Sequence, residues 1–420
     1  MGKENEYEKR WQAIQLYKKG YGFDEVLRRV RRSRGWLSKW LVRYRQQGKE
    51  GLRDQSRTPR RIWRKTPEQV IQKILATRDW LVSHHSRRSA FAGMGAEVIQ
   101  WELKQRKVKK IPAISTIARI LSRSGKTRKK RPLRNSPGRP YPYVRAKALG
   151  DLQQTDLVGP VYLRGPKGVT RFYSFHTIDV VGQTAWISHF PDKQSVSLCK
   201  HLLETWRTMG VPKVSQMDNE MAAAGGGRYP YSLSQVIRLH LLLGIQLVFI
   251  PQGEPGRNAT VESFNGLWKA RVLRRHACPA LEALRRVSGR FLQYYHYEKP
   301  HRRLRQRDQG TRYPGVLRDR VWGSLRHLPP AFTLRDYQDE QGHLSLPVAK
   351  GKISFVRKVD AHGYIEVNGK AYFIRKKLEG QYVMATVYPH RKRLVVKQEN
   401  RVIKSLPFHL KARVVEPLLG

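Results

Sequence analysis

The sequence Pro255-Gly-Arg-Asn-Ala-Thr-Val-Glu-Ser-Phe264 joins a polar loop to the start of a helix. Proline and glycine mark the loop, and apolar residues follow it at helical spacing: Leu267, Trp268, Val272 and Leu273. The pattern predicts a helix over 261–276. Glu262 therefore places a carboxylate in the first turn of that helix.

Two more acids lie on segments with the pattern of strands. Asp156 lies within Leu152–Val158, and Asp218 ends the segment 213–218. Carboxylates from a strand, the end of a second strand and a helix can converge, and oxygen ligands suit hard cations such as Mg²⁺. Two ions about 3.5–4 Å apart stabilise the attacking and leaving oxygens of a phosphodiester displacement. The alternative is a solvated surface carboxylate, which each acid taken alone would favour.

Four nearby acids compete with this set: Asp151, Asp179, Glu220 and Glu254. Asp151 lies five residues before Asp156, so on a strand the two side chains point to opposite faces. Glu254 precedes a proline in a loop and fits the pattern poorly. We interpret Asp179 as a second-strand residue that lines the site without binding metal.

Charge is distributed unevenly along the chain. The 420 residues carry a net charge of +51, which points to a polyanionic partner. Residues 150–275 hold 14 Lys/Arg and 9 Asp/Glu, a net of +5, which leaves +46 for the other 294 residues. The flanks are therefore suited to nucleic acid, while the centre keeps its acids. A ribosomal or chromatin-type basic protein is the alternative, but it does not explain the acid-retaining centre.

Composition also limits the other ligands and the location. Two cysteines, Cys199 and Cys278, are too few for a four-cysteine zinc site, and no zinc is expected. No nucleotide-binding glycine motif is present. The sequence has no apolar run of 18 residues and no signal-peptide core, so we expect no membrane partner and a cytoplasmic location.

The segment 1–55 predicts a first helix-turn-helix domain. Helices are expected at 7–20, 23–30 and 36–47, with a glycine-containing break before the last one. In such domains the last helix enters the major groove of DNA. The candidate DNA contacts lie off the apolar stripe of that helix: Ser38, Lys39 and Arg43. An ordinary three-helix core with a solvated basic face is the alternative.

The segments 56–125 and 126–149 predict a second DNA-binding domain and a basic linker. Helices at about 67–82, 95–106 and 114–124 form a second helix-turn-helix pattern. The linker opens with six basic residues in nine and continues into proline-rich sequence. We expect it to lie along phosphates, with a plain flexible linker as the alternative. Its candidate contacts are Lys126, Arg128, Lys129, Lys130 and Arg131.

From residue 150 the pattern changes to alternating strands and helices. Strands are predicted at 151–163, 172–181, 184–190, 213–218 and 245–250, and helices at 195–209, 233–244, 261–276 and 280–297. Three meandering strands followed by α/β units predict a mixed sheet flanked by helices.

This central segment, 150–300, resembles the retroviral-integrase-like catalytic core of DDE transposases, which has a ribonuclease H-like α/β fold. More closely, the chain is similar to transposases of bacterial insertion sequences that place helix-turn-helix domains ahead of that core. The motifs that carry the resemblance are Gln154-Thr-Asp156, Ile178-Asp-Val180, Met217-Asp-Asn219 and Pro255-x-x-Asn258-x-x-Val-Glu262-x-Phe264.

The resemblance implies that Asp156, Asp218 and Glu262 are catalytic and bind two Mg²⁺ or Mn²⁺ ions. Asn219 and Asn258 would shape the site or contact DNA. The implied reaction frees a 3′-hydroxyl at an element end and joins it to target DNA. The implied partners are double-stranded DNA and further copies of the chain, in a nucleoid-associated assembly. The alternatives are a DNA-binding regulator with a catalytically dead core and a structure-selective nuclease.

The chain departs from the family pattern in one place and continues beyond the core. Asp218 and Glu262 are 44 positions apart, longer than is usual, and 220–231 has the composition of an inserted loop. The segment 301–345 is a basic connector. Short alternating segments in 346–420 predict a small barrel, SH3-like by the resemblance. The expected protein is thus a multidomain α+β chain.

Overall fold

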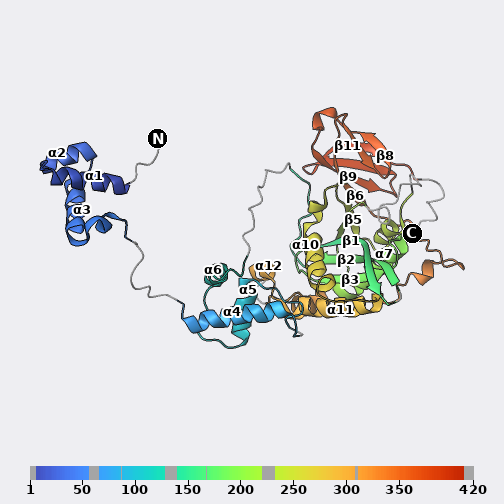
Figure 1. Ribbon diagram of the computed structural model, residues 1–420. Helices are drawn as coiled ribbons and strands as arrows, with labels where there is room; N and C mark the ends of the chain where they lie inside the picture. The colour runs from blue at the N-terminus through green and yellow to red at the C-terminus, as the bar shows by residue number, and fades with distance from the viewer. Residues whose placement is uncertain are drawn as a thin grey trace. The chain divides into compact units, whose positions relative to one another are not determined.

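The computed structural model describes residues 6–55, 66–86, 88–127, 140–166, 168–219, 232–307 and 311–410. The predicted inserted loop at 220–231 and four of the linker contacts lie outside these residues: Arg128, Lys129, Lys130 and Arg131. The chain forms two compact units, with the boundary between Glu68 and Gln69. Figure 1 shows the course of the chain through the elements of each unit.

The first unit is a small helical domain. Its elements are α1 (Glu6–Lys18), α2 (Phe23–Val30), α3 (Arg34–Gln47) and the 3₁₀-helix η1 (Gly48–Leu52). Ile14, Val26 and Leu37 are fully buried between the helices. The Ser33 hydroxyl accepts the Trp36 N–H, so α3 begins two residues earlier than predicted. The prediction of three helices with a break before the third is confirmed.

The second unit is built on a nine-stranded sheet with the order β11-β10-β9-β6-β5-β4-β1-β2-β3. Its strands are β1 (Leu152–Gly165), β2 (Gly168–Asp179), β3 (Ala185–Phe190), β4 (Val214–Met217), β5 (Gln246–Phe249), β6 (Ile353–Lys358), β9 (Tyr382–Tyr388), β10 (Arg393–Gln398) and β11 (Arg401–Pro407). The first three form an antiparallel meander, and β4 and β5 run parallel to β1. The predicted mixed sheet is confirmed.

Helices cover both faces of this sheet, as Figure 1 shows for α7 and α10. The elements are α7 (Ser195–Met209), α9 (Gln235–Leu242), α10 (Ala259–Trp268) with the π-turn η3 (Lys269–Leu273), and α11 (Leu281–Gln293) with the π-turn η4 (Tyr294–Glu298). Side chains alternate along β2: Phe175 packs in the cluster that contains α7 and α9, whereas Phe172 and Ile178 pack in the cluster that contains α10 and α11.

The second helical segment packs directly on the core instead of forming a core of its own. It consists of α4 (Glu68–Ser83), α5 (Ala96–Gln105) and α6 (Ile114–Arg123), close to the predicted bounds. Ile74 and Ile99 belong to the same buried cluster as Trp268 of α10. Between α4 and α5, the Phe91 ring lies 5.8 Å from the Phe291 ring. Arginines from η3 and the residues after it donate to backbone carbonyls of 90–92.

The C-terminal strands extend the core sheet. β6 pairs in parallel with β5 and antiparallel with β9, and the Phe249 and Phe355 rings of β5 and β6 stack at 5.0 Å. The expected separate SH3-like barrel is not confirmed: in the described part of the chain β11 pairs only with β10, and the sheet stays open. The physical reason is the outer edge of β5, whose unpaired backbone groups β6 covers.

Shorter elements complete the unit. They are the 3₁₀-helix η2 (Pro255–Asn258) before α10, α12 (Arg302–Arg307), α13 (Pro314–Val321), the 3₁₀-helices η5 (Trp322–Ser324), η6 (Arg335–Tyr337) and η7 (Lys376–Leu378), and the hairpin β7 (Tyr364–Val367) and β8 (Lys370–Phe373). None of the helices in the described ranges has the length and apolar character needed to span a bilayer.

Candidate active site

Three elements bring the predicted acids to one region of the second unit. Asp156 lies on β1, opposite His176 of β2. Asp218 directly follows β4, the parallel neighbour of β1. Glu262 lies in the first turn of α10, which packs against β1 and β2. All three side chains are half-buried, so each is packed against the protein on one side and accessible to solvent on the other.

Electrostatics connects the three acids. The pKa of Asp156 is raised from its ordinary value of 3.8 to about 6. Burial is the largest cause, and the negative charges of Asp218 and Glu262 add to it, against a lowering by hydrogen bonds from the Leu157 N–H and Asn265. The structure therefore places Asp218 and Glu262 where the charge of each acts on Asp156.

The three carboxylates are too far apart to bind one metal ion together. Across the described ranges, no three His, Cys, Asp or Glu side chains lie close enough together to hold a metal ion. A divalent cation nevertheless fits this group chemically, because Asp156 is partly buried beside two further acids whose negative charge a cation neutralises. Binding of an ion by all three would require their side chains to move closer together.

A hydrogen-bonded chain from His176 through Asn265 orients the Asp156 carboxylate. The Asn265 Nδ2 donates to Asp156 Oδ2 at 2.6 Å, and its Oδ1 lies 2.6 Å from His176 Nδ1. His176 is fully buried and packs edge-on against Trp268, and burial lowers its pKa to about 3. A neutral imidazole that donates from Nδ1 therefore fixes the Asn265 amide with its Nδ2 toward the carboxylate.

The helix start that carries Glu262 is tied to the sheet by two amides. Asn258 is only 2% exposed; its Nδ2 donates to the Thr155 carbonyl at 2.9 Å, and its Oδ1 accepts from Gln216 at 3.2 Å. The Gln154 side chain accepts the first N–H groups of α10, those of residues 260 and 261. Asn258 is thus engaged within the chain, which favours a role in shaping the site over a contact with DNA.

Asn219, next to Asp218, is engaged within the chain. Its Oδ1 accepts from Arg357 Nη2 at 2.7 Å, and its Nδ2 donates to the Ile250 carbonyl. Arg357 lies on β6 and also donates to the Glu366 carbonyl at 2.7 Å. Both polar atoms of the Asn219 amide are therefore used within the chain, which favours a role in shaping the site. A residue of the C-terminal strands instead supports the turn that carries Asp218.

The competing acids are committed elsewhere. Asp179 is fully buried, and its carboxylate accepts three backbone N–H groups. Burial raises its pKa, and the acid that adds to this rise is Asp151, not one of the three candidates. Asp179 therefore anchors the strand ends and does not line the site. Asp151 precedes β1 and pairs with Lys213 at 2.8 Å. Glu254 pairs with Arg257 at 3.0 Å and accepts the Tyr382 hydroxyl at 2.5 Å. Glu220 lies outside the described residues.

The predicted DNA contacts of the first unit divide into two kinds. Ser38 and Lys39 are exposed on α3, opposite the buried Leu37, as predicted. Arg43 is half-buried; its guanidinium lies 4.9 Å from the Trp40 ring centre and donates to Gln55 at 2.8 Å. In the second unit Lys126 pairs with Asp79 of α4 at 2.9 Å.

Family models match three segments of the chain. An integrase core domain model matches residues 243–307, and two homeodomain-like domain models match residues 5–53 and 36–121. The integrase segment includes Glu262 and α10, whereas Asp156 and Asp218 lie outside it. The chain therefore carries one match to an integrase core model and two matches to homeodomain-like models, which confirms its resemblance to DDE transposases and integrases.

Solved structures of viral integrases are similar to the chain at low identity. The HTLV-2 integrase catalytic core domain in complex with magnesium is 16% identical, covers 41% of this chain and 99% of its own, and has a TM-score of 0.31. The simian T-cell lymphotropic virus intasome in complex with PP2A regulatory subunit B56 gamma is 14% identical, covers 81% and 99%, and has a TM-score of 0.34. The BIV integrase catalytic core is 12% identical, covers 42% and 97%, and has a TM-score of 0.30. At these TM-scores the backbones of the chains superpose only in part.

Three supporting residues were missed from the sequence. Asn265 lies three positions after Glu262, on the same helix face, and this spacing could have identified it. His176 and Arg357 have no local signal, because their partners lie 89 and 138 positions away along the chain.

Proposed function

We propose that this chain is a DNA transposase that uses Asp156, Asp218 and Glu262 as metal-binding catalytic residues. It hydrolyses a phosphodiester at the end of an element and joins the freed 3′-hydroxyl to target DNA. The observation that supports this most directly is the raised pKa of Asp156, which reflects burial and the charges of the other two acids. Three carboxylates are kept together at a cost in repulsion, and a function that binds cations explains that cost.

The residues of the chain have separate roles in the proposed site. Asp156, Asp218 and Glu262 would hold two divalent ions, which when bound supply charge stabilisation for both oxygens of the displacement. Asn265 fixes the orientation of the Asp156 carboxylate. Asn258 fixes the start of the helix that carries Glu262. In this scheme water is the nucleophile of the hydrolysis, and the 3′-hydroxyl that it frees on the DNA is the nucleophile of the joining step.

DNA recognition is assigned to the homeodomain-like helices and to the general positive charge. Lys39 and Ser38 on α3 face solvent, where a groove-bound helix presents its contacts. Cutting and joining two element ends in one reaction requires two active sites, so the working form is a dimer or a larger assembly. The net charge of +51 suits an assembly that holds several DNA segments at once.

A strand-transfer assay tests the proposal. Labelled duplexes from the DNA that flanks the gene are incubated with plasmid target and Mg²⁺ or Mn²⁺, using the full chain and the variants Asp156→Asn, Asp218→Asn and Glu262→Gln. We expect joined product that needs the metal and all three acids, with binding of the end duplex retained in each variant. Glu254→Gln, at an acid already paired with Arg257, is the control that should keep joining.

The same assay separates the two other functions. End binding without cleavage by the wild-type protein would indicate a regulator with a dead core. Metal-dependent cleavage without joining would indicate a nuclease. A Glu262→Gln variant that still joins ends would remove Glu262 from the site.

A further inference from the structure

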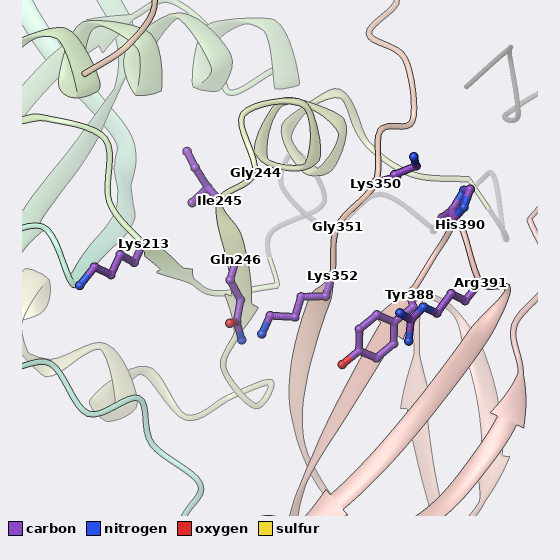
Figure 2. A pocket seen from close by; sticks show the side chains of 10 residues that line it. All are labelled: Lys213, Gly244, Ile245, Gln246, Lys350, Gly351, Lys352, Tyr388, His390 and Arg391. Carbon is purple, nitrogen blue, oxygen red and sulfur yellow. The ribbon is translucent and has the colours of Figure 1, made fainter. Parts of the chain in front are cut away.

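A second, oppositely charged site lies at the other end of the strands that carry the acids. A cavity of about 500 Å³ opens where β4, β5 and β6 begin and where β9 turns into β10. Figure 2 shows Lys213 on one side of it and Lys350, Tyr388, His390 and Arg391 on the other, with Gln246 and Lys352 between them. Basic side chains from three separate parts of the chain therefore meet around one hollow.

The charge of this cavity is only partly neutralised by its surroundings. Among the described residues that line it there is no Asp or Glu. Lys213 already pairs with Asp151, and Arg391 lies 5.7 Å from the Tyr388 ring centre. For Lys350 and Lys352, both exposed, the described part of the chain offers no ion pair. Convergent unpaired cations in a hollow favour an anionic ligand with several charges.

The position of the cavity separates it from the carboxylates. Lys213 and Asp218 flank β4, five residues apart, so about 16 Å of extended chain lies between the two sites. β6 repeats this arrangement, because Lys352 precedes the strand and Arg357, near its end, supports the turn of Asp218. The two sites therefore lie at opposite ends of the same group of strands.

We infer that this basic cavity binds backbone phosphates of a second DNA duplex, the target, away from the target phosphodiester that reacts at the carboxylates. The inference rests on the proposed function, in which a strand-transfer complex holds end DNA and target DNA together. Lysine and arginine without a groove-reading element contact phosphates without sequence preference. The ligand is therefore a duplex of any sequence, as a target must be.

The test compares two triple variants of the full chain that lose the same charge. Lys350→Ala/Lys352→Ala/Arg391→Ala removes the unpaired cations of the cavity. The control, Arg375→Ala/Lys376→Ala/Lys377→Ala, removes three equally exposed cations at η7, outside the lining. Each protein is first saturated with labelled end duplex, and a second duplex of unrelated sequence with another fluorophore is titrated in at several KCl concentrations.

We expect the cavity variant to bind the second duplex about tenfold more weakly at low salt, with a salt dependence reduced by two to three phosphate contacts. Its affinity for the end duplex should stay within about twofold of wild type, and the control should resemble wild type in both measurements. Unchanged binding of the second duplex, or an equal loss in the control, would overturn the inference. Because no cleavage is measured, an inactive protein that passes this test contradicts only the proposed chemistry.

Discussion

The two ends of the central parallel strands differ in how their charged side chains are held. At the carboxyl ends, Asp156 is hydrogen-bonded to Asn265, and the turn of Asp218 is held by Arg357 through Asn219. At the amino ends, Lys350 and Lys352 extend into solvent from a segment that leads into β6. At the carboxyl ends of the strands, hydrogen bonds hold individual acidic side chains in place. At the amino ends, these basic side chains lie near one another, and the described residues offer them no hydrogen-bonded partners that fix them.

This difference follows from what each kind of chemistry needs. Phosphoryl transfer depends on reacting groups held within a fraction of an ångström, which buried hydrogen bonds provide. Attraction of a polyanion depends on summed charge and tolerates flexible side chains. The same sheet can serve both because parallel strands align all their carboxyl ends at one edge and all their amino ends at the other.

The largest effect that would test this comparison is expected at Asn265. Asn265→Leu keeps the branched shape of the side chain but removes both hydrogen bonds, so Asp156 loses its fixed orientation and His176 loses its partner. We expect strand transfer to fall about 10- to 100-fold, with the half-saturating Mg²⁺ concentration raised. The Mg²⁺ titration distinguishes a loss of carboxylate positioning from a general destabilisation of the fold. Destabilisation would lower the activity without changing the half-saturating Mg²⁺ concentration.

Two companion variants sharpen the Asn265 test. His176→Phe keeps a ring against Trp268 and removes only the donor to Asn265, so it should shift the Mg²⁺ titration in the same direction by less. Ser263→Ala, exposed on the same helix, should leave the titration unchanged. Normal metal dependence in Asn265→Leu would mean that the acids are positioned by the backbone alone.

A smaller effect is expected at Arg357, which links the two ends along β6. Arg357→Ala removes the donor to Asn219 and leaves the Asp218 turn with one support fewer, so joining should fall about tenfold. Binding of a second duplex at the basic cavity should persist, because Lys350 and Lys352 are untouched. Strand-transfer and duplex-binding assays on the same preparation measure the two effects separately.

Two comparisons control the Arg357 measurement. Arg357→Lys keeps a donor and should recover part of the activity. Arg393→Ala removes an exposed arginine at the start of β10, two strands away from β6, and should keep full activity. Loss of both joining and second-duplex binding in Arg357→Ala would show that the ends are not independent.

Much of the acid end could be predicted from the sequence, and little of the basic end. Asp156, Asp218 and Glu262 each occur at a recognisable position on a strand or helix, so the pattern of elements brings them together. The expected separate barrel is not confirmed, because alternation predicts strands but not which edge they join, and the edge of β5 was open. Lys350 and Lys352 carry no motif, and only the pairing of β6 places them beside β4.

The smallest effect expected is a gain in stability from removing the charge of Asp156. With a pKa of about 6 in the folded protein against an ordinary 3.8, Asp156 binds its proton more tightly when folded. Wild-type stability relative to Asp156→Asn should therefore fall as pH rises from about 4 to about 6 and stay constant above. In EDTA at pH 7.5 the variant should be more stable, by at most about 3 kcal/mol.

Thermal unfolding of both proteins in EDTA between pH 4 and pH 8 measures this difference. The gain should vanish near pH 4, where both side chains are uncharged, and shrink when Mg²⁺ replaces EDTA, because a cation relieves the repulsion in wild type only. Asp336→Asn, at an exposed carboxylate, is the control and should show no gain. A variant less stable than wild type at pH 7.5 would mean that the hydrogen bond from Asn265 outweighs the repulsion, and the acid end would then be a structural ion cluster.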